Sequence, residues 1–326
     1  MVGPALRVAV ATTLCVIVAE CARLDFAFMS AMTAHRIMAQ TGFTAFQKGI
    51  ERIFGRIVGV FYGLLLLTLF SDSPASAAGT ILGLLVFFYG SLSGRMAYTF
   101  VNAGLLLAGI MAIGREDPSA AWPAGWSMIL EVALGVLMAD LVNFLSGAEK
   151  TVALQQAGPP LWPIQAAWLS HAAMMVVAVL LSQALMRLAE IPARQTLISV
   201  MILGVSADEQ ALIRKGRDRL TGALLGGAWG FASFLLLARL PYFGLLLALS
   251  FLGTFLAARQ ALSGSPRSYI GVQMGMVIPM VLLVAPAEFG TLTIVAHRLV
   301  GIVIAIAVLV VVSELWPGFQ KRAATA

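Results

Sequence analysis

Long apolar runs recur along the whole chain, separated by short breaks that carry charged residues, proline or glycine. A helix needs about 20 mostly apolar residues to cross a bilayer, so each run predicts a membrane-spanning helix. Clear spans lie near 4–22, 53–70, 79–94, 96–113, 124–146, 162–187, 220–238, 241–258, 268–286 and 292–315. Two further apolar segments, 24–38 and 191–206, are short and interrupted by polar residues, so each could span or be re-entrant.

The overall composition supports the same interpretation. Hydrophobic residues make up 60% of the chain and charged residues only 11%, a balance far from that of a soluble domain. We therefore expect an all-α, polytopic membrane protein whose first partner is the lipid bilayer. The net charge of +6 does not imply nucleic-acid binding, because basic loops on the cytoplasmic side of a membrane explain it.

One motif occurs twice. Residues 48–55 (KGIERIFG) match residues 215–222 (KGRDRLTG) at an offset of 167 positions, without a gap. In both copies, glycines continue at four-residue spacing beyond the motif. A weaker echo pairs Tyr98 and Asn102 with Tyr269 and Gln273. Such self-similarity predicts an internal repeat.

The charge pattern predicts how the two repeats are oriented. Both motif copies are strongly basic, and basic loops stay cytoplasmic, so the repeats should be parallel and contain an even number of spans. With the two short segments counted, this gives two six-helix halves, about 12 helices in all, and both termini in the cytoplasm. We expect a first repeat over 1–147, a cytoplasmic connector over 148–161, a second repeat over 162–317 and a cytoplasmic tail over 318–326.

The duplicated Lys-Gly-x-acid-Arg-x-x-Gly-x-x-x-Gly motif is accompanied by a late Arg-x-x-Gly (Arg298, Gly301) and a closing Leu-Trp-Pro at 315–317. Together these features resemble the fusaric acid resistance family, which is similar to aromatic acid exporters and, more remotely, to plant aluminium-activated malate channels. The resemblance implies a multi-pass protein of the cell inner membrane that exports organic acids, with a periplasmic adaptor protein as a candidate partner. Many members carry large cytoplasmic domains after each half, whereas the short connector here predicts a compact form.

We therefore expect an efflux transporter for small organic, mainly aromatic, carboxylic acids, with protons as the coupling ion. A passive organic-anion channel is the alternative, and a structural or lipid-organising protein is a distant third. No enzyme is expected, because no nucleotide-binding phosphate loop or nucleophile motif is present and the three histidines lie far apart in sequence. No cofactor or metal is expected, and a second copy of the chain is a further candidate partner.

The motif has two interpretations. Glycines four apart lie on one helical face and allow close helix packing, and the charges could serve only to orient the helix. Alternatively, the basic residues form two equivalent anion sites at the inner mouth, since the planar fork of arginine suits a carboxylate. The substrate-binding candidates are Lys48, Arg52, Lys215 and Arg219, with Glu51 and Asp218 holding the arginines, and the packing candidates are Gly55, Gly59, Gly222 and Gly226.

Glu131 and Arg298 are the clearest charges inside predicted spans, where an ionisable residue is costly and is usually paired or functional. Glu131 and Arg298 are again 167 positions apart, so we predict that they form an ion pair between the halves. The pair could be a static bridge. It could also be a gate in which protonation of Glu131 releases Arg298 for substrate, with His297 as a further candidate proton carrier.

Overall fold

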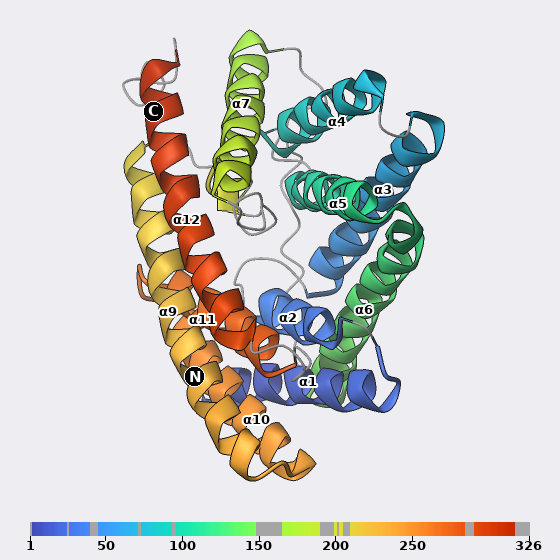
Figure 1. The fold of residues 1–326 in the computed structure, drawn as a ribbon. Helices are drawn as coiled ribbons and strands as arrows, with labels where there is room; N and C mark the ends of the chain where they lie inside the picture. Colours follow the sequence, from blue (N-terminus) through green and yellow to red (C-terminus); the bar gives the residue numbers. More distant parts are fainter. Residues whose placement is uncertain are drawn as a thin grey trace. The chain divides into compact units, whose positions relative to one another are not determined.

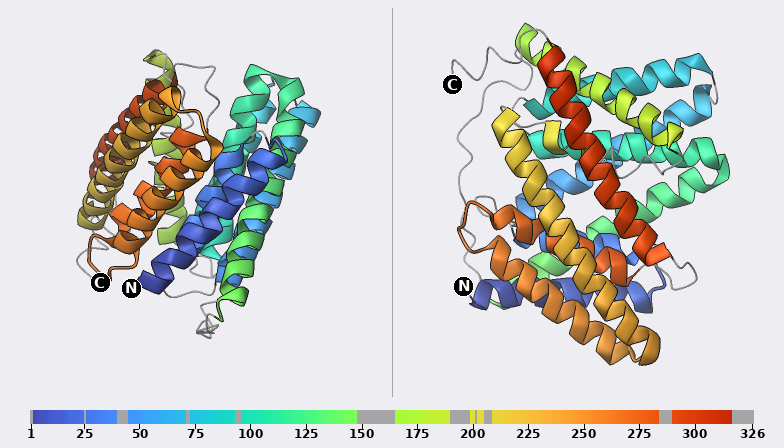
Figure 2. Two further views of the ribbon diagram at one scale, coloured as in Figure 1. Left: turned by 90° about the horizontal axis from the view of Figure 1, so that it is seen from below. Right: turned by 60° about the vertical axis from the view of Figure 1, so that its left-hand side comes forward.

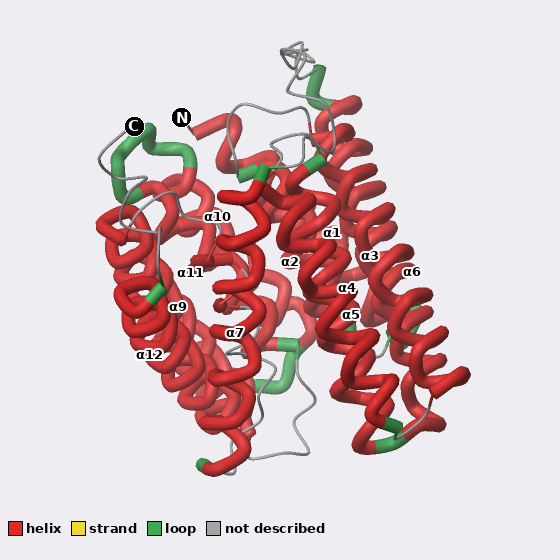
Figure 3. Tube along the Cα trace, turned by 90° about the horizontal axis from the view of Figure 1, so that it is seen from above, coloured by secondary structure: helices red, strands yellow, loops and turns green. Residues whose placement is uncertain are grey.

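The computed structural model describes residues 2–24, 26–39, 45–70, 73–92, 96–147, 165–189, 199–200, 202–204, 209–283 and 290–316. Within these residues the regular structure is entirely α-helical, and no strand occurs (Figure 3). The predicted connector 148–161 and tail 318–326 lie outside the described residues. The expected all-α class is therefore confirmed for the described part of the chain.

The helices follow the predicted apolar runs. In chain order they are α1 (Val2–Cys21), α2 (Ala27–Met38), α3 (Ala45–Phe70), α4 (Pro74–Leu92), α5 (Ala97–Glu116), α6 (Pro118–Leu145), α7 (Ala166–Leu188), α9 (Glu209–Arg239), α10 (Phe243–Ala261), α11 (Ser268–Leu282) and α12 (Gly290–Leu315). Among the described residues, nine helices are long and apolar enough to cross a membrane. The chain is thus a multi-pass α-helical membrane protein.

Two details differ from the predicted spans. A full span was expected over 268–286, but helix α11 has only 15 residues and is shorter than the nine candidate spans. It contains Pro279 close to its end. Helices α3 and α9 begin at Ala45 and Glu209, well before the expected starts at 53 and 220. The reason is that Lys, Glu, Arg and Gln are good helix formers, so the helix continues through the charged motif. The motif therefore lies in the first turns of α3 and α9 rather than in loops.

The described chain forms two compact units, and each takes helices from both sequence halves. Unit 1 contains residues 1–50, 127–154 and 217–299. In this unit α1 packs against α2 and α10, and α11 packs against α10 and α2 (Figures 1 and 2). A small buried cluster of Ala11, Cys15, Val16, Ala31, Ala34, Ala139 and Val142 joins α1, α2 and the end of α6. Small side chains here let these helix backbones approach closely.

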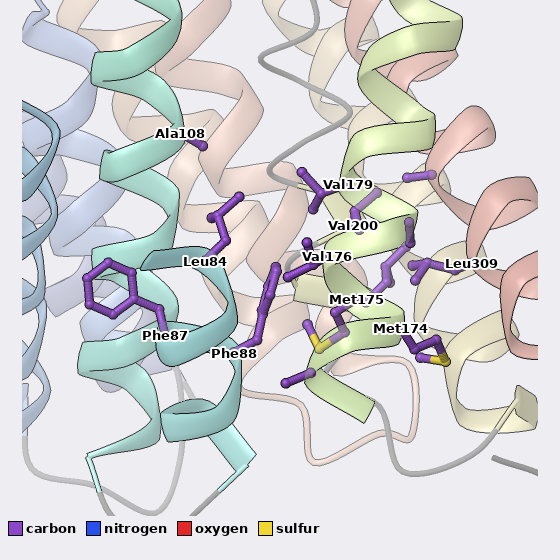
Figure 4. Packing of buried hydrophobic residues seen from close by; sticks show 14 of the residues in the cluster. Leu84, Phe87, Phe88, Ala108, Met174, Met175, Val176, Val179, Val200 and Leu309 are labelled. Carbon is purple, nitrogen blue, oxygen red and sulfur yellow. The ribbon is translucent and has the colours of Figure 1, made fainter. Parts of the chain in front are cut away.

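Unit 2 contains residues 51–126, 155–216 and 300–326. Helix α4 packs against α5 and α7 in this unit. Figure 4 shows Phe88 of α4 pointing toward Met175 and Val176 of α7, in a buried apolar cluster that also includes Leu309 of α12. Aromatic and methionine side chains fill the space between these helices, since both bury a large apolar surface.

Candidate functional site

The motif glycines bring two pairs of helices into close contact. A Cβ atom at Gly55 or Gly59 of α3 would collide with backbone oxygens of α5. A Cβ atom at Gly222 would lie 2.5 Å from the Ile270 oxygen of α11, and one at Gly226 would lie 2.7 Å from the Met274 oxygen. In each copy, therefore, the absence of a side chain lets the motif helix lie directly against the backbone of its neighbour.

The same helix pairs hold the motif arginines. Arg52 is 4% exposed, and its Nη1 donates to the Tyr98 hydroxyl of α5 at 2.7 Å. Arg219 is 0% exposed, and its Nη1 donates to Gln273 Oε1 of α11 at 3.0 Å. Asn102, the counterpart of Gln273 in the sequence echo, donates from Nδ2 to the Tyr98 carbonyl at 2.6 Å. Both guanidinium groups are thus buried and fixed by a polar side chain from the neighbouring helix.

The other charged residues of the motif occupy different environments. Lys48 and Asp218 are buried, whereas Glu51 and Lys215 are half-buried. Lys215 Nζ donates to the Ile202 carbonyl at 2.8 Å, so this lysine satisfies a backbone acceptor. The arginines were expected to be held by Glu51 and Asp218, but the sequence did not reveal the contributions of Tyr98 and Gln273. In the sequence, Tyr98 stood out only through its recurrence as Tyr269.

The predicted intramembrane pair, Glu131 and Arg298, belongs to unit 1. Arg298 is 2% exposed, and its Nη1 lies 3.6 Å from Met280 Sδ. Glu131 is 0% exposed, and its Oε1 accepts a hydrogen bond from the Phe26 backbone N–H at 2.6 Å. The ion pair between Glu131 and Arg298 stays a prediction. His297 is half-buried and, as the neighbour of Arg298 in a helix, points about 100° away from it.

Three arginines converge in unit 1. Arg298 of α12 lies close enough to Arg219 of α9 and Arg36 of α2 for their charges to interact, and Tyr269 of α11 lies close to both Arg219 and Arg298. His35, beside Arg36 in sequence, places its ring over Gly275, and its Nε2 lies 3.4 Å from the Gly271 carbonyl. Sequence reasoning gave Arg36 no functional role, because it lies in the short segment 24–38, whose contacts the sequence could not show.

Comparison with known families adds one match. Residues 14–142 match the family described as fusaric acid resistance protein-like. The matched part runs from α1 to α6 and includes the first motif copy and Glu131. No curated protein and no solved structure matches the chain. Residues 14–142 are therefore similar to the fusaric acid resistance protein-like family.

Proposed function

We propose that the protein is an inner-membrane efflux transporter for small organic carboxylic acids, aromatic ones above all, and that protons drive the export. The family match suggests transport related to fusaric acid resistance. The observation that carries the proposal is the complete burial of Arg219 in a helix long and apolar enough to span a membrane. Burying a charged guanidinium group is costly unless it is paired, so Arg219 is expected to interact with an anion or to serve transport.

The proposal includes an architecture of two parallel six-helix repeats with both termini in the cytoplasm. Matched helix contacts support it. Helix α1 packs on α10 in unit 1, and α7 packs on α4 in unit 2. The repeat offset of 167 positions relates α1 to α7 and α4 to α10, so the two contacts are equivalent under the repeat. The two motif helices also approach α5 and α11 through glycines at equivalent positions. Such pairing is what a duplicated membrane unit with a pseudo-twofold axis would produce.

Proton coupling rests on Glu131. A fully buried carboxyl group is favoured in its protonated form, and a nearby guanidinium group favours the ionised form. We propose that Glu131 alternates between these states as Arg298 binds and releases substrate, with His297 as a further proton carrier. The hydrogen bond from the Phe26 N–H holds one carboxyl oxygen in place, so proton exchange would occur at the other oxygen.

The test is transport by the purified protein in proteoliposomes. Vesicles are loaded with benzoate or succinate, and efflux is followed with and without an imposed pH gradient. We expect gradient-driven, uphill movement of benzoate by the wild type. Arg219→Gln should lower the rate by about tenfold or more, because it removes a charge-assisted hydrogen bond to the carboxylate.

The matched control is Arg217→Gln, which makes the same substitution at an exposed position on the same helix. It should leave the rate close to that of the wild type. Downhill flux without any effect of the pH gradient would identify a passive anion channel instead. Absence of flux for either acid, with or without the gradient, would refute the proposed function.

A further inference from the structure

We infer that unit 1 binds the headgroup of an anionic phospholipid where the start of α1 meets the end of α10 and the start of α11. Arg7, Arg259 and Arg267 form this surface, which we call the arginine surface. The inference goes beyond the proposed function and does not depend on it. None of the three residues was a candidate for binding in the sequence.

Apolar packing brings Arg7 and Arg259 to the same end of the unit. Ala5 and Val8 of α1 are buried in one cluster with Ala258 of α10. Each arginine is the immediate neighbour of one of these residues, so both lie within one helical turn of the contact. In both views of Figure 2, the N-terminus of α1 lies beside the turn that joins α10 to α11. The contact therefore places two guanidinium groups at one end of unit 1.

Hydrogen bonds hold Arg267 next to the same end of α10. Gln260 Nε2 donates to the Arg267 carbonyl at 3.3 Å, and the Arg267 backbone N–H donates to Ser265 Oγ at 3.2 Å. A Cβ atom at Gly271 would collide with the backbone of α10, so the first turn of α11 lies directly against that helix. Arg259 and Arg267 are both exposed, so a ligand in the bilayer can reach them.

The surrounding helices carry almost no negative charge. Helices α1, α2, α10 and α11, which pack on one another, contain one acidic residue, Glu20. It follows Arg7 by 13 positions (20 minus 7), about 20 Å along α1, and so lies at the opposite end of that helix. Within the described part of the chain, no ion pair joins the three arginines to the remaining acidic residues of unit 1, which are Glu131, Asp140 and Asp218. The arginine surface is therefore complementary to an anion.

An exposed apolar stripe leads to the arginine surface and indicates a lipid. Leu252, Leu256 and Arg259 are four and three positions apart, so they lie on one face of α10, and all three are exposed. Helices α1 and α10 are both long and apolar enough to span a membrane, so their ends lie near a bilayer surface. A phospholipid would place an acyl chain along the leucines and its phosphate at the arginines. A soluble anion would use only the arginines, so the surface fits a phospholipid better.

The equivalent contact in unit 2 forms without these charges. The repeat offset of 167 places Met174 of α7 at the position of Arg7, and Leu92 of α4 at the position of Arg259. Helix α4 nevertheless packs on α7 in unit 2, as α10 packs on α1 in unit 1. Helix packing therefore does not require arginines at these positions, and a ligand of unit 1 explains their presence. Clusters of basic residues at the end of spanning helices are typical sites for acidic lipid headgroups.

The test is binding of phosphatidylglycerol to the purified protein in detergent, followed by native mass spectrometry. Phosphatidylcholine with the same acyl chains, whose headgroup has no net charge, should bind more weakly. Arg7→Gln, Arg259→Gln and Arg267→Gln should each weaken phosphatidylglycerol binding by about fivefold, and the triple variant by about 100-fold. The matched control is Arg239→Gln, which changes an exposed arginine at the end of α9, close to the opposite end of α10. It should leave the binding unchanged.

The outcomes that overturn the inference are distinct. Equal binding of phosphatidylcholine by the wild type would exclude recognition of charge. Unchanged binding by the triple variant, or equal weakening by Arg239→Gln, would leave the arginines with a role in membrane orientation alone. The unfolding temperature of the wild type should rise with phosphatidylglycerol but not with the same concentration of glycerol phosphate, and an equal rise would identify a soluble anion instead. Because the three side chains are exposed or half-buried, the variants should unfold near the wild-type temperature without lipid.

Discussion

The contact between α9 and α11 makes a prediction whose size can be worked out from the structure. In Gly226→Ala, the new Cβ would lie 2.7 Å from the Met274 oxygen and 2.9 Å from Val277 Cβ, whereas ordinary contacts begin at 3.4 Å. The oxygen belongs to the backbone of α11, so it cannot rotate away as a side chain would. The two helices must therefore separate by several tenths of an ångström, and such overpacking costs about 1 to 3 kcal/mol.

The matched control is Gly109→Ala in α5, because a Cβ atom there would meet no atom within 4 Å. Both variants gain the same preference of alanine over glycine in a helix, about 0.5 to 1 kcal/mol. The gain cancels in the comparison, so Gly226→Ala should be less stable than Gly109→Ala by the overpacking term alone. Equilibrium unfolding in mixed detergent micelles measures both free energies. Equal stability of the two variants would refute the close packing of α9 on α11.

Two further predictions concern single hydrogen bonds. Tyr98→Phe removes the hydroxyl that accepts a hydrogen bond from the buried Arg52, so it should lower the free energy of unfolding by about 1.5 to 3 kcal/mol. The control is Tyr62→Phe, which removes a hydrogen bond to the neutral Gly79 carbonyl. It should lower the free energy of unfolding by less in the same assay. Hydrogen bonds from the Ser119 hydroxyl and backbone N–H lower the pKa of the exposed Asp117 carboxyl group from its ordinary value of 3.8. The ionised carboxylate therefore stabilises the folded protein above pH 3.8. This stabilisation is lost as the pH falls through the lowered pKa. The stability difference between wild type and Asp117→Ala should therefore shrink below about pH 4, and a difference that does not change with pH would contradict this.

The apolar pattern predicted where helices lie better than where they begin and end. Runs of about 20 apolar residues have few alternatives to a spanning helix, so the existence of the long helices followed from the sequence. Their ends did not, because Lys48 and Arg52 lower the local hydropathy without interrupting the helix. For α11, hydropathy extended the expected span to 286, but the helix ends at Leu282, three residues after Pro279.

The candidate site was predictable only where a residue stood out from its own segment. Arg298 and Glu131 are charges in apolar runs, so the cost of burying them identified both. Arg36 lies in a short, mixed segment, and its proximity to Arg298 depends on contacts across 262 positions of sequence (298 minus 36). Tyr98 and Gln273 are ordinary polar residues until the packing of α3 on α5 and of α9 on α11 is known. The repeat indicated their equivalence, but not that each binds an arginine.

The contacts show which parts of the structure each half of the sequence can form alone. Each motif arginine is held within its own half, Arg52 by Tyr98 and Arg219 by Gln273, so either half could position one guanidinium group alone. Unit 1 as a whole needs both halves, because α2 comes from the first half and α11 from the second. The packing of α2 on α11 joins the two halves within unit 1, so neither half could form this unit alone.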